Sequence, residues 1–238
     1  MPGLLHGRSG HASMPGIADN ALVKAAAYIE RLARFSPEPR LIPETEGFLA
    51  AVLGSVPGAG EALEAARAVD PLAAELLEPL LAATVAPTMA HASDKRNVIP
   101  ALCTVEIDCR LLPGQTPAEA ERAIRELLGP GDYELVNSEA AQGGTRSRGD
   151  GPLWAAAESF IAAEEPGAGV APMCVAGFTD SHWLREAFGT VAYGFFPARA
   201  MDPEVAARLV HSADERVPVA DLELGVRWLQ HAARAVCG

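Results

Sequence analysis

Residues 101–110 carry the most regular pattern in the chain, in which small or apolar side chains at every second position alternate with mostly polar ones. The apolar set begins at Ala101 and ends at Cys109, and the polar set includes Glu106 and Asp108. A period of two predicts a β-strand that buries one face and leaves the other in water. This strand is the most clearly predicted element, and the others are expected before and after it in the sequence.

A helix is expected directly after the strand. Beyond a Pro-Gly turn, Thr116 can cap a helix, Pro117 suits its first position, and Glu119 can close a capping box. The helix should end near residue 129, where Gly and Pro follow each other, and a further strand is expected at 132–137.

Further helices and strands are expected in the residues that precede the strand at 101–110. A short strand and turn are expected within residues 4–14, and Asp19 or Asn20 can cap a helix that runs to about residue 35. The apolar face of this helix is expected to comprise Leu22, Ala26, Ile29 and Ala33. The Ala- and Leu-rich residues 44–83 predict two or three helices, and a strand is expected near 84–91. The resulting β-α-(helical insert)-β-β-α-β order over residues 1–137 is that of a ferredoxin-like sandwich.

A Gly-, Ser- and Arg-rich stretch at 138–151 is interpreted as a linker, and residues 152–238 as a second region. Its expected elements are helices at 152–164, 180–187 and 218–236 and strands at 171–176 and 190–196. Two strands are too few for an independent sheet, so an unpaired edge and an exposed apolar face are expected. We therefore expect the chain to form an oligomer.

The composition narrows the possible functions. The chain of 238 residues has a net charge of −12 and a pI near 4.9, which argues against nucleic-acid binding and against anionic membranes. It contains no apolar run of about 18 residues, and its N-terminus is unlike a signal peptide. Four scattered cysteines without C-x-x-C spacing suit a reducing compartment. A cytoplasmic location is expected.

Three polar residues of the first region are candidate ligand contacts. His11 at a tight turn could hydrogen-bond a substrate carbonyl or a developing oxyanion, or it could be a surface-loop histidine. Asn97 could orient a ligand amide or carboxylate, or it could be a turn asparagine. Arg110 could hold a carboxylate through a bidentate pair, or it could pair with Asp108 or Glu106.

Two further candidates lie in the second region. Gly177 and Thr179 belong to a turn before a helix where backbone N–H groups can meet an anion, although Thr179 or Asp180 could simply cap the helix. His211 could be a metal ligand or part of a charged turn. None of the six histidines has H-x-x-x-H or H-E-x-x-H spacing, so the sequence alone supplies no partner ligand for His211.

These motifs occur in an order that resembles the zinc aminoacylase/carboxypeptidase family of metallopeptidases. That family includes acetylornithine deacetylase, succinyl-diaminopimelate desuccinylase and carboxypeptidase S-like enzymes. The resemblance covers nearly all of the chain outside residues 44–83. The motifs that carry it are Gly7-x-x-Gly10-His11-Ala12-Ser13-Met14-Pro15, Asp19-Asn20-Ala21, Asn97-Val98-Ile99-Pro100, Asp108-x-Arg110-Leu111-Leu112-Pro113-Gly114, Gly177-x-Thr179-Asp180 and His211-Ser212-x-Asp214-Glu215-Arg216-Val217.

The resemblance implies a role for each region. Residues 1–137 would be a lid that mediates homodimerisation, and the residues after the linker would be the C-terminal part of an α/β catalytic domain. His211 would match the family's last zinc ligand. His11 and Asn97 would match lid residues that reach across the dimer to substrate, and the residues near the substrate carboxylate would be Arg110, Gly177 and Thr179. Phe178 departs from the pattern, because the family usually has a second glycine there, and its side chain could narrow the pocket.

The resemblance also implies a chemistry that this chain does not carry in full. In the family a zinc-bound water, deprotonated by a glutamate, attacks the amide carbonyl of an N-acyl-amino acid or small peptide. The H-x-D and Glu-Glu motifs that supply most ligands and that glutamate precede the lid in the family and are not identified here. We therefore expect a truncated member that by itself is inactive and binds zinc weakly or not at all. The alternative is a non-catalytic dimerisation or binding module derived from the family.

Overall fold

The computed structural model describes residues 1–136 and 143–238, and the chain forms two compact units. The first unit comprises Met1–Ile42, Glu78–Thr145 and Val175–Gly177. The second unit comprises Pro43–Leu77, Arg146–Cys174 and Phe178–Gly238. These compact units do not test the expected division into a lid of residues 1–137, a linker and a catalytic segment, which stays a prediction.

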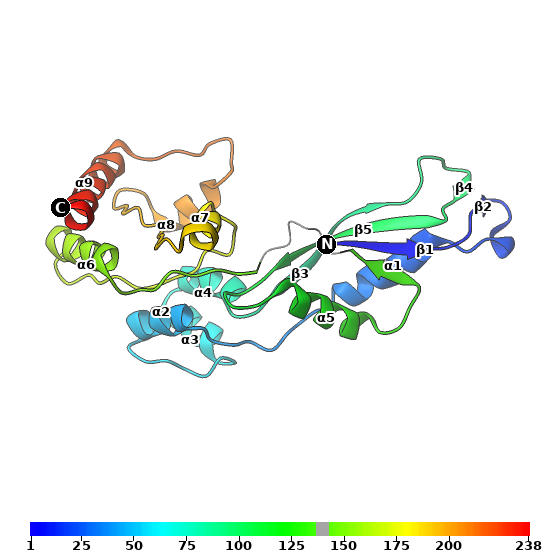
Figure 1. Ribbon diagram of the computed structural model, residues 1–238, viewed down its shortest axis with the longest axis horizontal. Helices are drawn as coiled ribbons and strands as arrows, with labels where there is room; N and C mark the ends of the chain where they lie inside the picture. The colour runs from blue at the N-terminus through cyan, green and yellow to red at the C-terminus, as the bar shows by residue number, and fades with distance from the viewer. Residues whose placement is uncertain (137–142) are drawn as a thin grey trace. The chain divides into compact units, whose positions relative to one another are not determined.

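The first unit is built on a four-stranded antiparallel sheet (Figure 1). Its strands are β1 (Pro2–His6), β3 (Thr84–His91), β5 (Leu102–Arg110) and β6 (Tyr133–Leu135), in the spatial order β3-β5-β1-β6. Helix α1 (Ala21–Leu32) follows β1, and α5 (Pro117–Leu128) follows β5. This order and connectivity confirm the ferredoxin-like sandwich predicted from the sequence.

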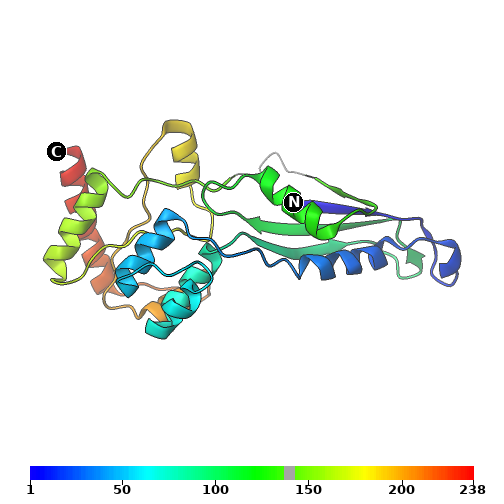
Figure 2. The ribbon, with the colours of Figure 1, turned by 90° about the horizontal axis from the view of Figure 1, so that it is seen from below.

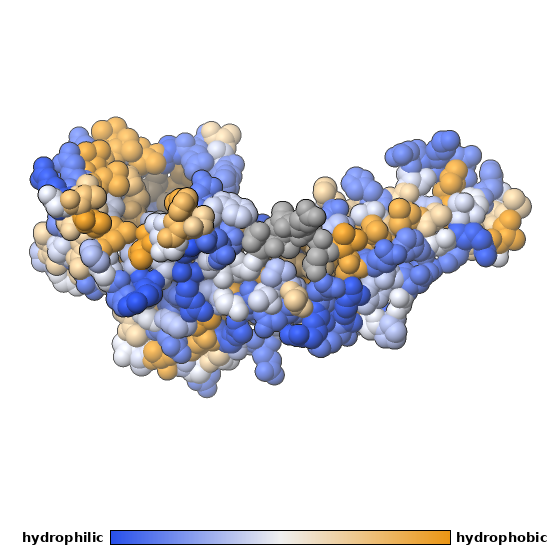
Figure 3. Space-filling model, viewed as in Figure 1, coloured by the Kyte–Doolittle hydropathy of each residue, from blue (hydrophilic) through white to orange (hydrophobic). Residues whose placement is uncertain are grey.

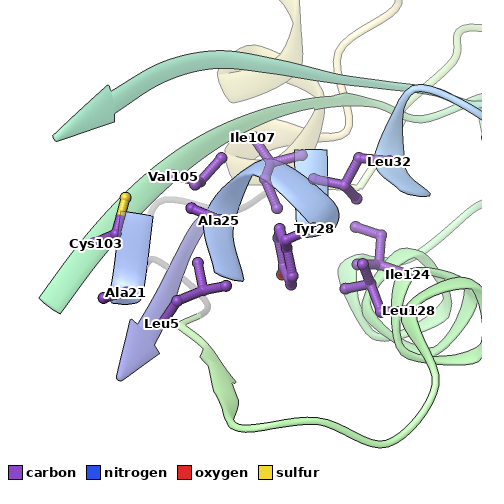
Figure 4. Close-up of a cluster of buried hydrophobic side chains, with 10 residues drawn as sticks. All are labelled: Leu5, Ala21, Ala25, Tyr28, Leu32, Cys103, Val105, Ile107, Ile124 and Leu128. Atoms are coloured by element: carbon purple, nitrogen blue, oxygen red, sulfur yellow. The ribbon is translucent and has the colours of Figure 1, made fainter. Parts of the chain in front are cut away.

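The core of the first unit lies between one face of this sheet and the two helices (Figure 4). Cys103, Val105 and Ile107 are at most 2% exposed, and their alternation along β5 is the one the sequence predicts. From α5, Ile124 and Leu128 complete the cluster. Because burying one such side chain contributes about 1.5–3 kcal/mol, this layer is the main source of stability of the unit.

The buried face of α1 differs from the predicted one. The residues that pack on the sheet are Ala21, Ala25, Tyr28 and Leu32, whereas Leu22 is 49% exposed. The two sets have the same spacing and are displaced by one residue, which turns the helix by about 100°. Both sets avoid the charged side chains of the helix, so the periodicity alone could not distinguish them. Packing against the sheet selects the set with small alanines at the closest approach.

Local capping chemistry follows the sequence closely. The Asn20 side chain accepts a hydrogen bond from the Leu22 N–H, at 3.0 Å, and so begins α1. Thr116 and Glu119 form the predicted reciprocal capping box at the start of α5. The Thr116 backbone N–H and hydroxyl lower the pKa of the Glu119 carboxyl, because both hydrogen bonds favour its charged form.

A second, two-stranded sheet carries the motif around His11. Strand β2 (Gly10–His11) pairs antiparallel with β4 (Val98–Ile99), and a short 3-10 helix, η1 (Pro15–Ile17), follows. A Cβ atom on Gly10 would lie 2.8 Å from the Ala18 side chain, so a glycine is needed for this close approach. The small sheet and its turns are termed the tip loop, residues 10–17 and 97–99.

The second unit consists of helices (Figure 2). The predicted two or three helices within 44–83 are α2 (Pro43–Leu53), α3 (Ala62–Val69) and α4 (Pro71–Leu77), followed in the first unit by the 3-10 helix η2 (Glu78–Leu80). The C-terminal part contains α6 (Pro152–Glu164), α7 (Ser181–Phe188), α8 (Pro203–Leu209) and α9 (Val219–Cys237). Helices α6 and α9 pack through Phe160, Leu224 and Trp228.

The prediction of two strands in the second region was wrong. Residues 171–176 and 190–196 run without ladder hydrogen bonds, and within residues 143–238 the structure shows no strand. A strand persists only where a partner pairs with its N–H and C=O groups, and the described part of this region offers none. The sheet edge expected there, on which the oligomer prediction depended, is therefore not formed.

One helix was missed and one cap was not formed. Helix α8 lies between the expected strand at 190–196 and the expected helix at 218–236, where no helix was predicted, and Asp202 caps it by accepting from the Glu204 and Val205 N–H groups. The Asp-Pro pair that begins α8 is a recognisable start signal. Asp180 does occupy the N-cap position of α7, but its side chain makes no capping hydrogen bond. In the described residues, no helix has both the length and the apolarity needed to cross a bilayer.

Candidate functional site

His11 and Asn97 are brought together in the tip loop, although 86 positions separate them in the sequence. His11 pairs with Val98 in the β2–β4 ladder, and the Ala12 N–H donates to the Asn97 carbonyl oxygen at 3.0 Å. Both residues are exposed. The tip loop therefore presents an imidazole from β2 and a carboxamide from the turn before β4 to the surroundings, a pair of groups suited to hydrogen-bonding a carbonyl or carboxylate oxygen.

The imidazole of His11 is held by its own turn. Its Nδ1 lies 2.7 Å from the Ser13 hydroxyl oxygen and accepts from the Ser13 backbone N–H at 3.2 Å. The turn closes through a hydrogen bond from the Met14 N–H to the His11 carbonyl oxygen, at 2.9 Å. The sequence motif contains Ser13, but its contact with the ring was not predicted from the sequence. A hydroxyl two residues after a histidine is the signal that could have suggested it.

Arg110 lies at the far end of β5 from the tip loop. Eight residue steps along a strand correspond to roughly 26 Å, so Arg110 does not join His11 and Asn97 in one site. Its Nε and Nη2 donate to the two carboxylate oxygens of Asp108 at 2.7 and 2.9 Å. Of the alternatives left open by the sequence, the structure shows the pair with Asp108. A substrate carboxylate would have to compete with this exposed pair.

Gly177 and Thr179 lie on either side of Phe178, before α7. A Cβ atom at Gly177 would meet only the Val175 side chain, at 3.7 Å, and the backbone there does not require glycine. The Thr179 carbonyl oxygen accepts from the His182 N–H at 3.0 Å. The Phe178 ring packs on His182 and Trp183, with centroids 5.0 and 5.8 Å apart. The role of these positions beside a substrate carboxylate remains a prediction.

His211 occupies a turn between α8 and α9 with an unusual backbone. Its φ of 61° is in the left-handed region, which is uncommon for a residue with a side chain. The His211 backbone N–H donates to the Glu215 carboxylate at 3.1 Å, so Glu215 stabilises the turn. The side chain of His211 is exposed.

The residues present do not fit a zinc site. Catalytic zinc is normally held by three protein ligands at about 2.0–2.3 Å. Across residues 1–136 and 143–238, no three His, Cys, Asp or Glu side chains gather closely enough to hold a metal ion. His211 therefore lacks a ligand set among these residues, and no reaction step is assigned to a metal here.

Asp221 on α9 is a buried carboxylate whose role was not predicted. It is 1% exposed, and its two oxygens accept from the N–H groups of Arg199, Ala200 and Met201 at 2.7–2.9 Å. The Ala200 bond and then the Arg199 bond are the largest causes of a lowered pKa for this carboxyl. An acceptor with three backbone donors fixes the loop before α8, which is a structural role.

The first unit is a ferredoxin-like α/β sandwich, a fold that by itself does not define a function. The sequence matches the peptidase dimerisation domain of the M20 peptidases over residues 5–135, more than half of the 238 residues. The chain belongs to this family. Its assignment to the aminoacylase, deacetylase or carboxypeptidase branch remains a prediction. No curated protein matches the sequence.

Solved structures of peptidases share the fold. They include the dipeptidase Dug1p from Saccharomyces cerevisiae, at 13% identity and a TM-score of 0.55, with 99% of this chain and 54% of that chain covered. The aminopeptidase PepT from Bacillus cereus has 13% sequence identity and a TM-score of 0.55, and the match covers 100% of this chain and 51% of that chain. A tripeptidase from Staphylococcus aureus has 13% sequence identity and a TM-score of 0.54, and the match covers 97% of this chain and 49% of that chain. The chain thus spans about half the length of these structures, and at this identity the likeness concerns the fold.

Proposed function

We propose that this chain provides the dimerisation lid and the C-terminal part of the catalytic domain of an M20-type hydrolase. The enzyme would cleave an amide bond in an N-acyl-amino acid or a small peptide. The observation that carries the proposal is the tip loop, where His11 and Asn97 lie side by side on a peptidase dimerisation domain. Similar folds in proteins described as a dipeptidase, an aminopeptidase and a tripeptidase support the choice of a peptide-like substrate.

His11 is the catalytic residue that this chain contributes. Its imidazole donates a hydrogen bond to the carbonyl oxygen of the scissile amide, which stabilises the negative charge that develops as the carbonyl is attacked. Asn97, in the turn before β4, orients the same end of the substrate through its amide. Arg110, Gly177 and Thr179 of the copy whose site the tip loop serves bind the substrate carboxylate in this proposal, and His211 of that copy would be one ligand of a metal held mainly by other residues. A metal bound in the complete site would supply the chemistry of an activated water.

The lid forms a homodimer so that the tip loop of one copy serves the site of the other. The edge strand β3 is suited to this contact: its eight residues, Thr84–His91, include no Lys, Arg, Asp or Glu, and Met89 is 56% exposed. Exposed strand edges without charge pair readily with another strand, although Pro87 and the irregular register beside it shorten the usable edge. The opposite edge, β6, has only three residues.

The remaining ligands and the base come from polypeptide outside these 238 residues, so the chain alone lacks turnover. Exposed apolar side chains of α9 support this view. They include Val219, Leu222, Val226 and Leu229, which are 49–72% exposed and repeat at steps of three and four residues. Figure 3 shows apolar surface in the region of α9. Such a stripe is normally covered by another helix or by a sheet.

The test is coexpression with the polypeptide encoded directly upstream, provided that it carries the family's H-x-D and Glu-Glu motifs. We expect zinc- or cobalt-dependent hydrolysis of dipeptides or N-acyl-amino acids by the combination and none by the chain alone. His11→Ala should lower kcat by about 100-fold, the effect of losing one oxyanion donor. Turnover by the chain alone that disappears in His211→Ala would contradict the inactivity. A dimer without an upstream partner would favour the binding module.

A further inference from the structure

The contact between Ser13 and His11 determines which ring nitrogen carries the proton. A neutral imidazole has one N–H donor and one acceptor nitrogen. The Ser13 backbone N–H, which can only donate, points at Nδ1 from 3.2 Å. Nδ1 must therefore be the acceptor, and the proton of the neutral ring resides on Nε2. The Ser13 hydroxyl, 2.7 Å from the same nitrogen, is then also a donor.

We infer that Ser13 is a positioning residue that holds His11 in the Nε2–H tautomer and directs this N–H away from the tip loop. The inference rests on the proposed function for the role of the outward N–H, while the tautomer itself follows from the contacts within the turn. Ser13 does not touch the substrate in this view and acts through His11. The two residues belong to one turn, so the contact between them is local.

The surrounding backbone keeps the ring in place. Gly10 and His11 are paired with Ile99 and Val98, and the turn is closed by the Met14 N–H. With Nδ1 occupied, the ring offers a single outward group, an N–H donor. A protonated nitrogen cannot bind a metal ion, so His11 in this form recognises an oxygen acceptor such as the carbonyl of an amide. This is the donor that a developing oxyanion requires.

The tautomer can be measured directly on the full chain labelled with 15N-histidine. Long-range proton–nitrogen spectra distinguish a protonated from an unprotonated ring nitrogen, and His11→Ala identifies the signal. We expect Nδ1 of His11 to be unprotonated in the wild type. In Ser13→Ala the loss of one neutral hydrogen bond should increase the share of the Nδ1–H tautomer by about fivefold. Ser13→Thr should restore the wild-type spectrum, and the exposed Ser36→Ala should leave it unchanged.

A protonated Nδ1 in the wild type, or a Ser13→Ala spectrum identical to it, would overturn the inference. In the coexpressed enzyme, Ser13→Ala should reduce kcat by several-fold with KM nearly constant, and Ser13→Thr should recover it. If the spectra behave as expected but His11→Ala leaves kcat unchanged, the proposed function fails and the tautomer assignment stands. The spectroscopic and kinetic measurements thus separate the two hypotheses.

Discussion

The two units satisfy their backbone hydrogen bonds in different ways. In the first unit, β1 and β5 are paired on both sides, and a layer of two helices covers one sheet face. In the second unit, the segments 171–174 and 190–198 run without strand pairing, and α9 leaves an apolar stripe exposed. The loop at 199–201 relies on a single carboxylate, Asp221. In the described residues, the first unit therefore has a self-contained core with a free edge at β3, whereas the second unit leaves an apolar helix face uncovered.

The largest effect should come from deleting a buried side chain of the first unit. Leu32 is fully buried between α1 and the sheet, so Leu32→Ala should lower the free energy of unfolding of this unit by about 2–5 kcal/mol. Hydrogen exchange of β5 amides measures it. The matched control is Leu229→Ala on α9, where the side chain is 59% exposed and the change should stay within about 0.5 kcal/mol.

The tryptophans separate the responses of the two units. Trp154, Trp183 and Trp228 all belong to the second unit, so their fluorescence reports its unfolding alone. Leu32→Ala should leave the midpoint of that transition in place. If Leu32→Ala lowers both the fluorescence midpoint and the protection of the β5 amides, the two units unfold as one. Separate free energies of unfolding could then not be assigned to them.

A charge on the edge of β3 should have the next largest effect. Met89→Lys puts an ammonium group on the edge proposed to pair with a second copy, where two lysines related by a two-fold axis would repel each other. The dimer dissociation constant should rise by about tenfold or more, equivalent to roughly 1.4 kcal/mol. Sedimentation velocity over a concentration series measures it.

The matched control is Val136→Lys, which introduces the same charge just after β6, at the opposite edge. Val136 is 40% exposed and so resembles Met89 in its setting. If Val136→Lys dissociates the dimer and Met89→Lys does not, the interface lies at the β6 side and the assignment of β3 is wrong.

A smaller effect is expected from the capping box of α5. Thr116→Ala removes the hydroxyl that accepts from the Glu119 N–H, at a cost of about 0.5–2 kcal/mol. Thr116→Ser keeps the hydroxyl and should behave nearly as the wild type. Amide exchange in the first turn of α5 is the measurement. An equal loss in both variants would assign the stabilisation to the Thr methyl group instead of the cap.

These cases show which features can be predicted from sequence. The strand at 101–110 and the capping box depend on side chains within a few positions, and both were predicted correctly. The buried face of α1 depends on the sheet it packs against, so a pattern displaced by one residue fitted equally well. The expected strands at 171–176 and 190–196 had suitable residues but no partner, and a partner is not a local property.

In the candidate site, too, local contacts could be predicted from the sequence and contacts between distant segments could not. The sequence identified His11 and Asn97 separately, but their adjacency results from the β2–β4 pairing of segments far apart in the chain. The contact between Ser13 and His11 is local and could have been predicted from the turn. The contacts of Asp221 with residues 199–201 depend on how α9 packs, and its sequence neighbours give no sign of them.

The smallest effect at neutral pH is expected for Asp221→Asn. The remaining carbonyl oxygen can still accept from Arg199 and Ala200, and only the Met201 bond is lost. The pH dependence should change more clearly. The pKa of the Asp221 carboxyl is lowered in the folded state, so its stabilising contribution is present above about pH 4, the unfolded value, and is lost as pH falls below it.

The difference between the urea midpoints of wild type and Asp221→Asn, followed by tryptophan fluorescence, should therefore be constant from about pH 7 to 5 and shrink below about pH 4. A difference that grows on acidification would mean that the carboxylate is destabilising in the folded state. A loss of amide protection at 199–201 without a change in the first unit would show that one carboxylate orders this loop. That result would extend the comparison between the units to a single side chain, since the first unit achieves the same order with a complete sheet.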